Sequence, residues 1–261
     1  LLPTLLCHSI SRVSLGGLPV GRLAAAIWTT LLLATGSALL IARLFRRGHA
    51  ATTSIVQGGI RFNNYMALAI AVGLYGAGGL GSAGVVAGLI VTGVQTILTF
   101  VFVLGREEKL SPGRILVRVI LNPLLLGCLV GFGFAAIGGM PPGLDPFART
   151  LGAAALAIGL LCVGAGLQVS ALREETPLQV VVGLQKLLLV PAVTLLLCRL
   201  LGLDETITGI CVLSLATPTA TSAYVQARTE GGDARLMAST ITLQHLAGIV
   251  TLPVWALALR G

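Results

Sequence analysis

Residues 62–105 read FNNYMALAIAVGLYGAGGLGSAGVVAGLIVTGVQTILTFVFVLG, a run that contains no Asp, Glu, Lys or Arg. One α-helical crossing of the hydrocarbon layer, which is roughly 30 Å thick, takes about 20 apolar residues. The run is therefore long enough for two crossings. Its glycines crowd the middle, between Gly73 and Gly84, where we expect a tight turn between two helices. This stretch alone indicates an α-helical membrane protein.

The rest of the chain repeats this pattern of long uncharged runs. Only 10% of all residues are charged, 56% are apolar and the mean hydropathy is +0.98, whereas a soluble domain carries about 25% charged residues. The runs do not alternate polar and apolar residues, as the strands of a membrane β-barrel would. We therefore expect about eight complete helical spans, at 22–44, 54–76, 81–104, 115–138, 150–170, 178–202, 206–228 and 236–259.

The ends of these spans give the outline of the chain. Residues 1–10 resemble the end of a further span, and we expect its beginning to lie upstream of Leu1. The polar link 106–114 divides the chain into two portions, 1–110 and 111–261. Most Lys and Arg residues lie at span ends, so the net charge of +8 indicates membrane topology and not nucleic-acid binding.

Several function classes lack their motifs. The sequence contains neither HExxH, nor GxSxG, nor a Walker motif, so no catalytic residue, enzyme activity or cofactor is expected. The five cysteines are scattered and mostly within spans, where they serve as small apolar residues and not as a metal site. All nine Asp and Glu residues lie in loops or at span ends. This favours anion uniport, or coupling through neutral oxygen atoms, over a carboxylate-based ion site.

Two spans differ from the others because they contain polar and helix-breaking residues. Residues 58–65 read GGIRFNNY and residues 216–224 read ATPTATSAY. An offset of about 153–155 residues brings the two stretches into correspondence. Interrupted spans at matching positions of two halves point to the binding site of an inverted-repeat transporter. The alternative is two kinked spans whose Ser, Thr and Asn side chains bond only to neighbouring helices.

The breaks themselves should create the site. An interrupted helix leaves N–H and C=O groups that lipid cannot satisfy, so these groups must face protein or a wet cavity. The N-terminal ends of the half-helices carry a partial positive charge that attracts anions. Gly58 and Gly59 are expected at the first break and Pro218 at the second. A proline in a helix interior costs about 3 kcal/mol. In the span at 115–138, Pro123 is expected to interrupt the helix and Asn122 to bond to the carbonyls that are freed ahead of it.

The expected substrate-binding residues are hydrogen-bonding groups at the two breaks and one cation inside a span. They are Asn63, Asn64, Thr217, Pro218, Thr219, Thr221 and Lys186. Asn63 and Asn64 can donate to a carboxylate, or they can instead cap the second half-helix. Lys186 can attract an anion if it lies against the cavity, or its ammonium group can reach the headgroups. His245 can couple proton movement or simply bond to a neighbouring helix.

Several of these motifs together resemble the auxin efflux carrier family. They are RFNNY at 61–65, LNPL at 121–124, GAGL at 164–167, KLLLVP at 186–191, the run from ATPTATSAY to GGD at 216–233, and the final span at 239–253. The resemblance covers nearly the whole chain. It implies a ten-span carrier made of two inverted five-span repeats, similar to bile-acid symporters and sodium/proton antiporters. In such carriers the fourth and ninth spans are broken and cross near mid-membrane.

Family members export auxin in plants, and bacterial relatives are described as permeases for malate and similar carboxylates. The resemblance therefore implies a multi-pass carrier of a small organic anion in the plasma (inner) membrane, working by alternating access. Its partners would be the lipid bilayer and that anion, without nucleic acid, and a homodimer is compatible with the family. The alternative is a membrane receptor or scaffold that binds a similar ligand without transporting it.

Overall fold

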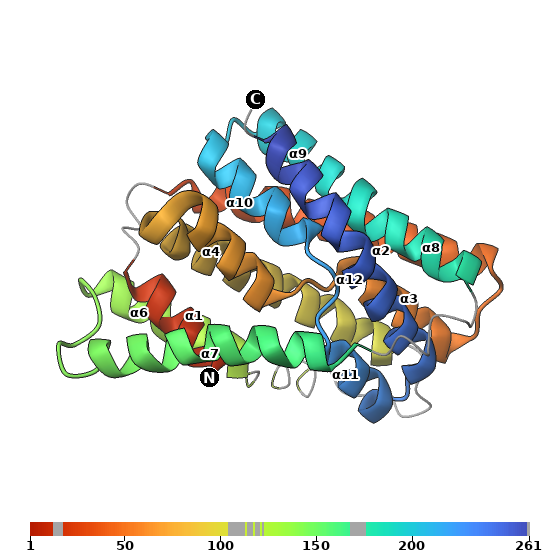
Figure 1. Ribbon diagram of the computed structural model, residues 1–261, viewed down its shortest axis with the longest axis horizontal. Coiled ribbons are helices and arrows are strands. Elements are labelled where there is room, and N and C mark those ends of the chain that lie inside the picture. The colour runs from red at the N-terminus through yellow and green to blue at the C-terminus, as the bar shows by residue number, and fades with distance from the viewer. Residues whose placement is uncertain are drawn as a thin grey trace.

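The computed structural model describes residues 1–12, 18–103, 113, 117, 121, 123–167 and 176–259. Every regular element within them is helical, as expected (Figure 1). The helices are α1 (Leu2–Ser11), α2 (Val20–Leu44), α3 (His49–Ile60), α4 (Asn64–Val103), α6 (Pro123–Ala136), α7 (Asp145–Ala165), α8 (Thr176–Leu184), a π-helical turn (Gln185–Leu189), α9 (Val190–Leu200), α10 (Glu205–Ala216), α11 (Ser222–Glu230) and α12 (Ala234–Ala258).

Five helical stretches in the described residues are long and apolar enough to cross a membrane. They are Val20–Leu44, Gly78–Val103, Asp145–Ala165, Pro177–Leu200 and Ala234–Ala258. Each overlaps one of the eight expected spans, with bounds that differ by up to five residues. Two of the remaining three, expected at 54–76 and 206–228, are each divided into shorter helices. The third was expected to begin at residue 115, and only its part from Pro123 to Ala136 forms a described helix.

The expected turn within the long uncharged run is present at Gly76. Its φ of 65° and ψ of −158° interrupt the helical backbone of α4. Such positive φ values are strained for residues with a Cβ atom and are adopted readily by glycine. The glycine-rich stretch thus allows the chain to change direction between two apolar segments.

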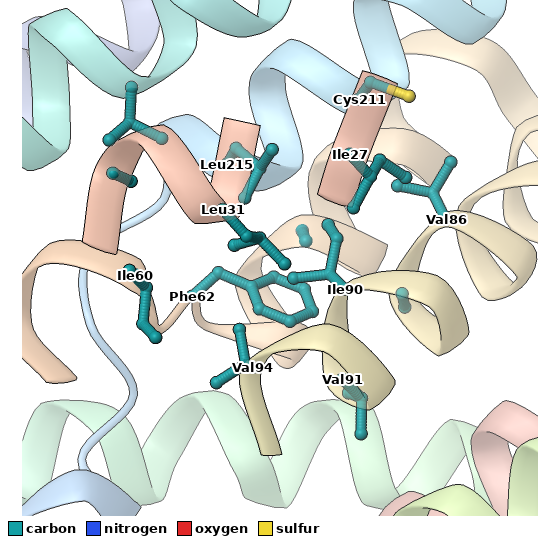
Figure 2. Close-up of a cluster of buried hydrophobic side chains, with 14 of the residues drawn as sticks. Ile27, Leu31, Ile60, Phe62, Val86, Ile90, Val91, Val94, Cys211 and Leu215 are labelled. Carbon is teal, nitrogen blue, oxygen red and sulfur yellow. The ribbon is translucent and has the colours of Figure 1, made fainter. Parts of the chain in front are cut away.

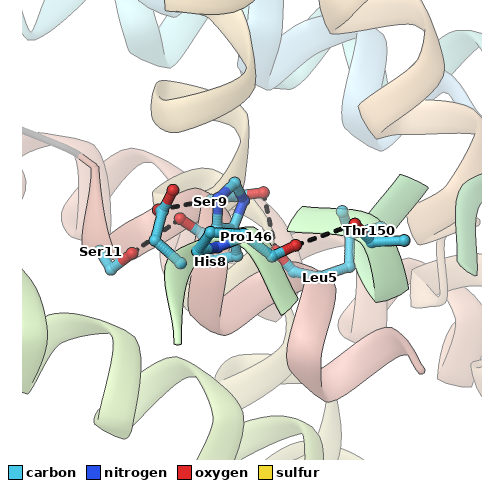
Figure 3. A network of polar contacts seen from close by, with 7 residues as sticks. Leu5, His8, Ser9, Ser11, Pro146 and Thr150 are labelled. Carbon is cyan, nitrogen blue, oxygen red and sulfur yellow. Dashed lines mark hydrogen bonds and ion pairs between the residues drawn. The ribbon is translucent and has the colours of Figure 1, made fainter. Parts of the chain in front are cut away.

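The helices form two layers joined by α4 (Figure 1). α1 packs against α6 and α7, and all three also contact α4. On the opposite side, α2, α9, α10 and α12 pack with α3 and α8, and α4 contacts α10 and α2 as well. Within the first layer, Nε2 of His8 in α1 lies 3.3 Å from Oδ1 of Asp145 at the start of α7 (Figure 3). The three helices α1, α6 and α7 together are called the outer layer.

Apolar side chains fill the space between α2, α4 and α10. Ile27 and Leu31 of α2 meet Ile90 of α4, Leu215 of α10 and Phe62, which precedes α4 (Figure 2). The outward faces are also apolar, with many large hydrophobic side chains exposed, as is appropriate for helices surrounded by lipid. The buried core therefore lies directly beside the interruption between α3 and α4.

Candidate functional site

Both predicted interruptions are confirmed. α3 ends at Ile60, the next three residues are not helical, and α4 begins at Asn64. α10 ends at Ala216 and α11 begins at Ser222, with irregular backbone between them. Each predicted span is therefore two half-helices.

Gly58 and Gly59 lie inside the last turn of α3, so their expected position at the break itself was wrong. They are needed for close packing instead. A Cβ atom on Gly58 would lie 3.0 Å from Cγ2 of Thr240, and one on Gly59 would lie 2.5 Å from Oε1 of Gln185. Because these two residues have no side chain, α12 and the π-helical turn can approach the end of α3.

The two breaks cross and hydrogen-bond to each other. The backbone N–H of Asn63 donates to Oγ1 of Thr217 at 3.0 Å, and Oγ1 of Thr219 donates to the carbonyl of Gly58 at 3.1 Å. From α12, the Gln244 amide accepts from the Thr219 N–H and donates to the Gly58 carbonyl, both at 2.9 Å. Backbone groups released by the breaks are thus satisfied within the protein, as lipid requires.

The crossing has two chemically different sides. A cavity of ≈ 110 Å³ opens on the side where α4 and α11 begin, and residues 61–65 and 220–222 line it. The ends of α3 and α10 lie on the other side, where Gln244 contacts Gly58 and Lys186 contacts Leu215. Two half-helix N-termini, each with a partial positive charge, therefore lie at one cavity. This arrangement favours an anion.

Arg61 supplies a full positive charge to the cavity. Its guanidinium donates to Oε1 of Gln57 at 3.2 Å, to Oγ of Ser222 at 3.1 Å and to Oε1 of Gln226. All three partners are neutral, and in the described parts of the chain no Asp or Glu forms an ion pair with it. Arg61 was not among the expected substrate-binding residues. The signal was nevertheless visible, because an arginine inside a membrane span is expected to be functional.

The two asparagines contribute buried polar atoms without partners. Asn63 is 1% exposed and Asn64 is 8% exposed, and both line the cavity. Oδ1 of Asn63 accepts from the N–H of Met66 at 3.3 Å and so caps α4, one of the two expected roles. Nδ2 of Asn63 and Oδ1 of Asn64 have no hydrogen-bond partner among the described residues. Buried polar atoms are normally paired, so these two are available to a ligand.

The other expected residues divide between the cavity and its support. Thr221 lines the cavity. Thr217 and Thr219 hold the crossing together instead, and Pro218 packs so closely on α12 that a Cβ atom on Gly248 would lie 2.9 Å from its Cγ. Lys186 is fully buried but is not a cavity residue, and its Nζ donates to the carbonyl of Leu215 at 2.6 Å.

Two further residues, Asn122 and Pro123, were expected to have a structural role. Asn122 lies outside the described residues. Pro123 starts α6 and does not interrupt it, because a proline at the first helical position loses no intrahelical hydrogen bond. His245 bonds through Nδ1 to the carbonyl of Ile241 in its own helix, at 2.8 Å.

Apolar residues of α4 and of the outer layer complete the lining of the cavity. Val91 and Val94 come from α4, whereas Leu124 comes from α6 and Cys162 and Val163 come from α7. The cavity therefore lies between the outer layer and the crossing. Relative movement of these two parts would change its shape and its access.

A family of known proteins matches the chain. The model of a family described as membrane transport protein matches residues 1–256, which include both interrupted helices. No individual curated protein matches the chain. The family match agrees with the resemblance seen in the sequence motifs.

Proposed function

The chain belongs to the membrane transport protein family, that of the auxin efflux carriers, and on that premise we propose that it is a secondary carrier of a small organic anion. The anion binds at the cavity beside the crossing. Arg61 and the N-termini of α4 and α11 attract its carboxylate, and the free amide of Asn63 donates to it.

One observation carries the proposal: Arg61 lies at the cavity without a carboxylate partner in the described chain. A charge at mid-bilayer costs about 2.5–3.5 kcal/mol on insertion scales. Neutral partners offset this cost only in part, so the cavity retains a positive potential. An anionic substrate supplies the missing countercharge, whereas a cation would be repelled.

The lining further favours a monocarboxylate with an apolar body. Arg61 is the one cationic side chain that lines the described cavity, and much of the remaining lining is apolar, with valine and leucine side chains beside the polar Gln95 and Tyr65. A second carboxylate, as in malate, would find no second cation there and would lose hydration against the apolar part of the lining. We therefore propose that an auxin-like acid binds more tightly than malate.

We propose that the carrier works by alternating access, which the position of the cavity between the outer layer and the crossing supports. The outer layer and the remaining helices would move relative to each other, exposing the cavity first on one side of the membrane and then on the other. We propose that portions 1–110 and 111–261 are inverted repeats, together forming the eight spans expected from the sequence. We also propose a plasma (inner) membrane location and a homodimer.

The test is flux in liposomes that contain the purified full-length gene product. Uptake of labelled indole-3-acetate and malate is compared for the wild type, Arg61→Gln and Arg61→Lys, with Arg199→Gln as a control outside the cavity. We expect the wild type and the control to transport, Arg61→Gln to be inactive, and Arg61→Lys to retain part of the flux. Binding without flux would favour the receptor alternative. Equal flux in Arg61→Gln and the wild type would refute the site.

A further inference from the structure

The π-helical turn at Gln185–Leu189 is a polar junction between three helices. Nε2 of Gln185 donates to the carbonyl of Ala34 in α2 at 2.9 Å. The next residue, Lys186, donates to Leu215 of α10, and the carbonyl of Leu187 accepts from Nε1 of Trp255 in α12 at 2.9 Å. Single π-helical turns occur frequently at functional sites. Here the turn directs three consecutive residues to three different helices.

Lys186 lies at the C-terminal end of the half-helix α10. Leu215 is the last residue but one of α10, and the chain leaves the helix at Thr217. The carbonyl of Ser214 accepts from Thr217, from its Oγ1 at 2.7 Å and its N–H at 3.3 Å. The Leu215 carbonyl accepts from Nζ of Lys186 at 2.6 Å. The ammonium group therefore completes a helix end that the break has left open.

The charge of this helix end suits a cation. The C-terminus of a helix carries a partial negative charge, and in carriers with discontinuous helices such ends and unwound carbonyls coordinate a coupling sodium ion. The Lys186 side chain is fully buried, and the described residues include no carboxylate paired with it. Its positive charge is thus opposed by backbone dipoles, in the manner of a bound metal ion.

We infer that Lys186 is a built-in cation, whose ammonium group occupies the place at the end of α10 where a coupling sodium ion would otherwise bind. The inference rests on the proposed carrier function and specifies how that carrier is energised. Because the positive charge is covalently attached, the α10 end needs no cation from solution. Anion flux should therefore be independent of sodium and potassium.

Ion replacement on the wild type is the first part of the experiment. Uptake of labelled indole-3-acetate into liposomes is measured with sodium, potassium or choline as the main cation, at constant pH and ionic strength. Equal flux in all three supports the inference, and a requirement for sodium or potassium overturns it. Absence of flux in every medium would contradict the proposed carrier function. The role of Lys186 as a built-in cation would then be decided by the second part of the experiment.

The second part of the experiment removes the ammonium group of Lys186 by substitution and then supplies an ammonium group as a free cation in solution. Lys186→Ala deletes a segment with the shape of n-propylammonium, and the melting temperature is measured in detergent with that cation or with n-propanol, a neutral molecule of similar shape. The inference predicts that n-propylammonium raises the melting temperature of the variant by about 3 °C or more, whereas n-propanol does not and the wild type responds to neither. An equal response to both molecules, or to neither, overturns it.

A shape-preserving variant covers the case in which Lys186→Ala does not fold. Lys186→Met keeps the unbranched shape and most of the length of the side chain without its charge, and we expect its flux to fall about 10-fold or more in choline medium. Wild-type flux from Lys186→Met in that medium would overturn the inference.

Discussion

The backbone N–H of Asn63 donates a hydrogen bond of 3.0 Å to the hydroxyl oxygen of Thr217, 154 residues further along the chain. Asn63 directly precedes α4, and Thr217 directly follows α10. The offset that brings the two interrupted stretches into correspondence in the sequence thus also joins two residues in space. Contact between equivalent positions is expected where a two-fold axis passes, which supports the proposed inverted repeats.

Substitutions of Asn63 should separate helix capping from anion binding. Asn63→Ala removes both the cap of α4 and the free Nδ2 donor, whereas Asn63→Asp keeps an oxygen that can cap the helix. We expect both to lower flux about 10-fold or more, because a lost hydrogen bond to a charged group costs about 1.5–3 kcal/mol. Flux in liposomes measures this. Near-normal flux in Asn63→Asp would mean that Asn63 acts only as a cap.

Pro218→Ala should abolish flux while leaving membrane insertion intact. Alanine restores a backbone N–H and favours continuation of α10 through the break, which would move the N-terminus of α11 away from the cavity. The matched control is Pro253→Ala, which replaces an exposed proline inside α12. Size-exclusion chromatography checks folding of both variants. Normal transport by Pro218→Ala would contradict the assigned role of the break.

Gly159→Ala should slow transport, because the added methyl group would clash at the contact between the outer layer and the crossing. Gly159 of α7 faces Tyr65 at the start of α4 so closely that a Cβ atom would overlap the tyrosine ring. Overpacking of this kind costs about 1–3 kcal/mol. Gly164→Ala, on the same helix, is the control, because a Cβ atom there meets nothing within 4 Å. Comparison of uptake rates tests this, and equal rates for the two variants would argue against a moving contact at Gly159.

Cys162 provides a probe of the cavity without any substitution. Its side chain is exposed and lines the cavity, whereas Cys128, Cys198 and Cys211 are buried. We expect alkylation of Cys162 by N-ethylmaleimide to be slowed by bound indole-3-acetate and less by malate at the same concentration. Mass spectrometry of the modified peptide follows the rate. A rate unchanged by either acid would place the binding site elsewhere.

The helical spans and both interruptions could be predicted from the sequence because their causes are local. An apolar run in lipid must satisfy its own backbone, which only a helix or a closed barrel can do, and a lack of alternation excluded the barrel. Pro218 lacks the N–H that a continuing helix needs, and the polar RFNNY motif is unlike the apolar spans around it. The role of Gly58 and Gly59 was missed, since these residues lie within α3 and are explained by neighbours distant in the chain.

The sequence by itself determined the class of protein and the positions of the two breaks. Only the tertiary structure decided which residues face the cavity. Arg61 and Lys186 look alike in the sequence, as single cations inside apolar spans, yet the first lines the cavity and the second contacts the end of α10. Which of the two faces the cavity depends on packing between segments far apart in the chain, which no local pattern encodes.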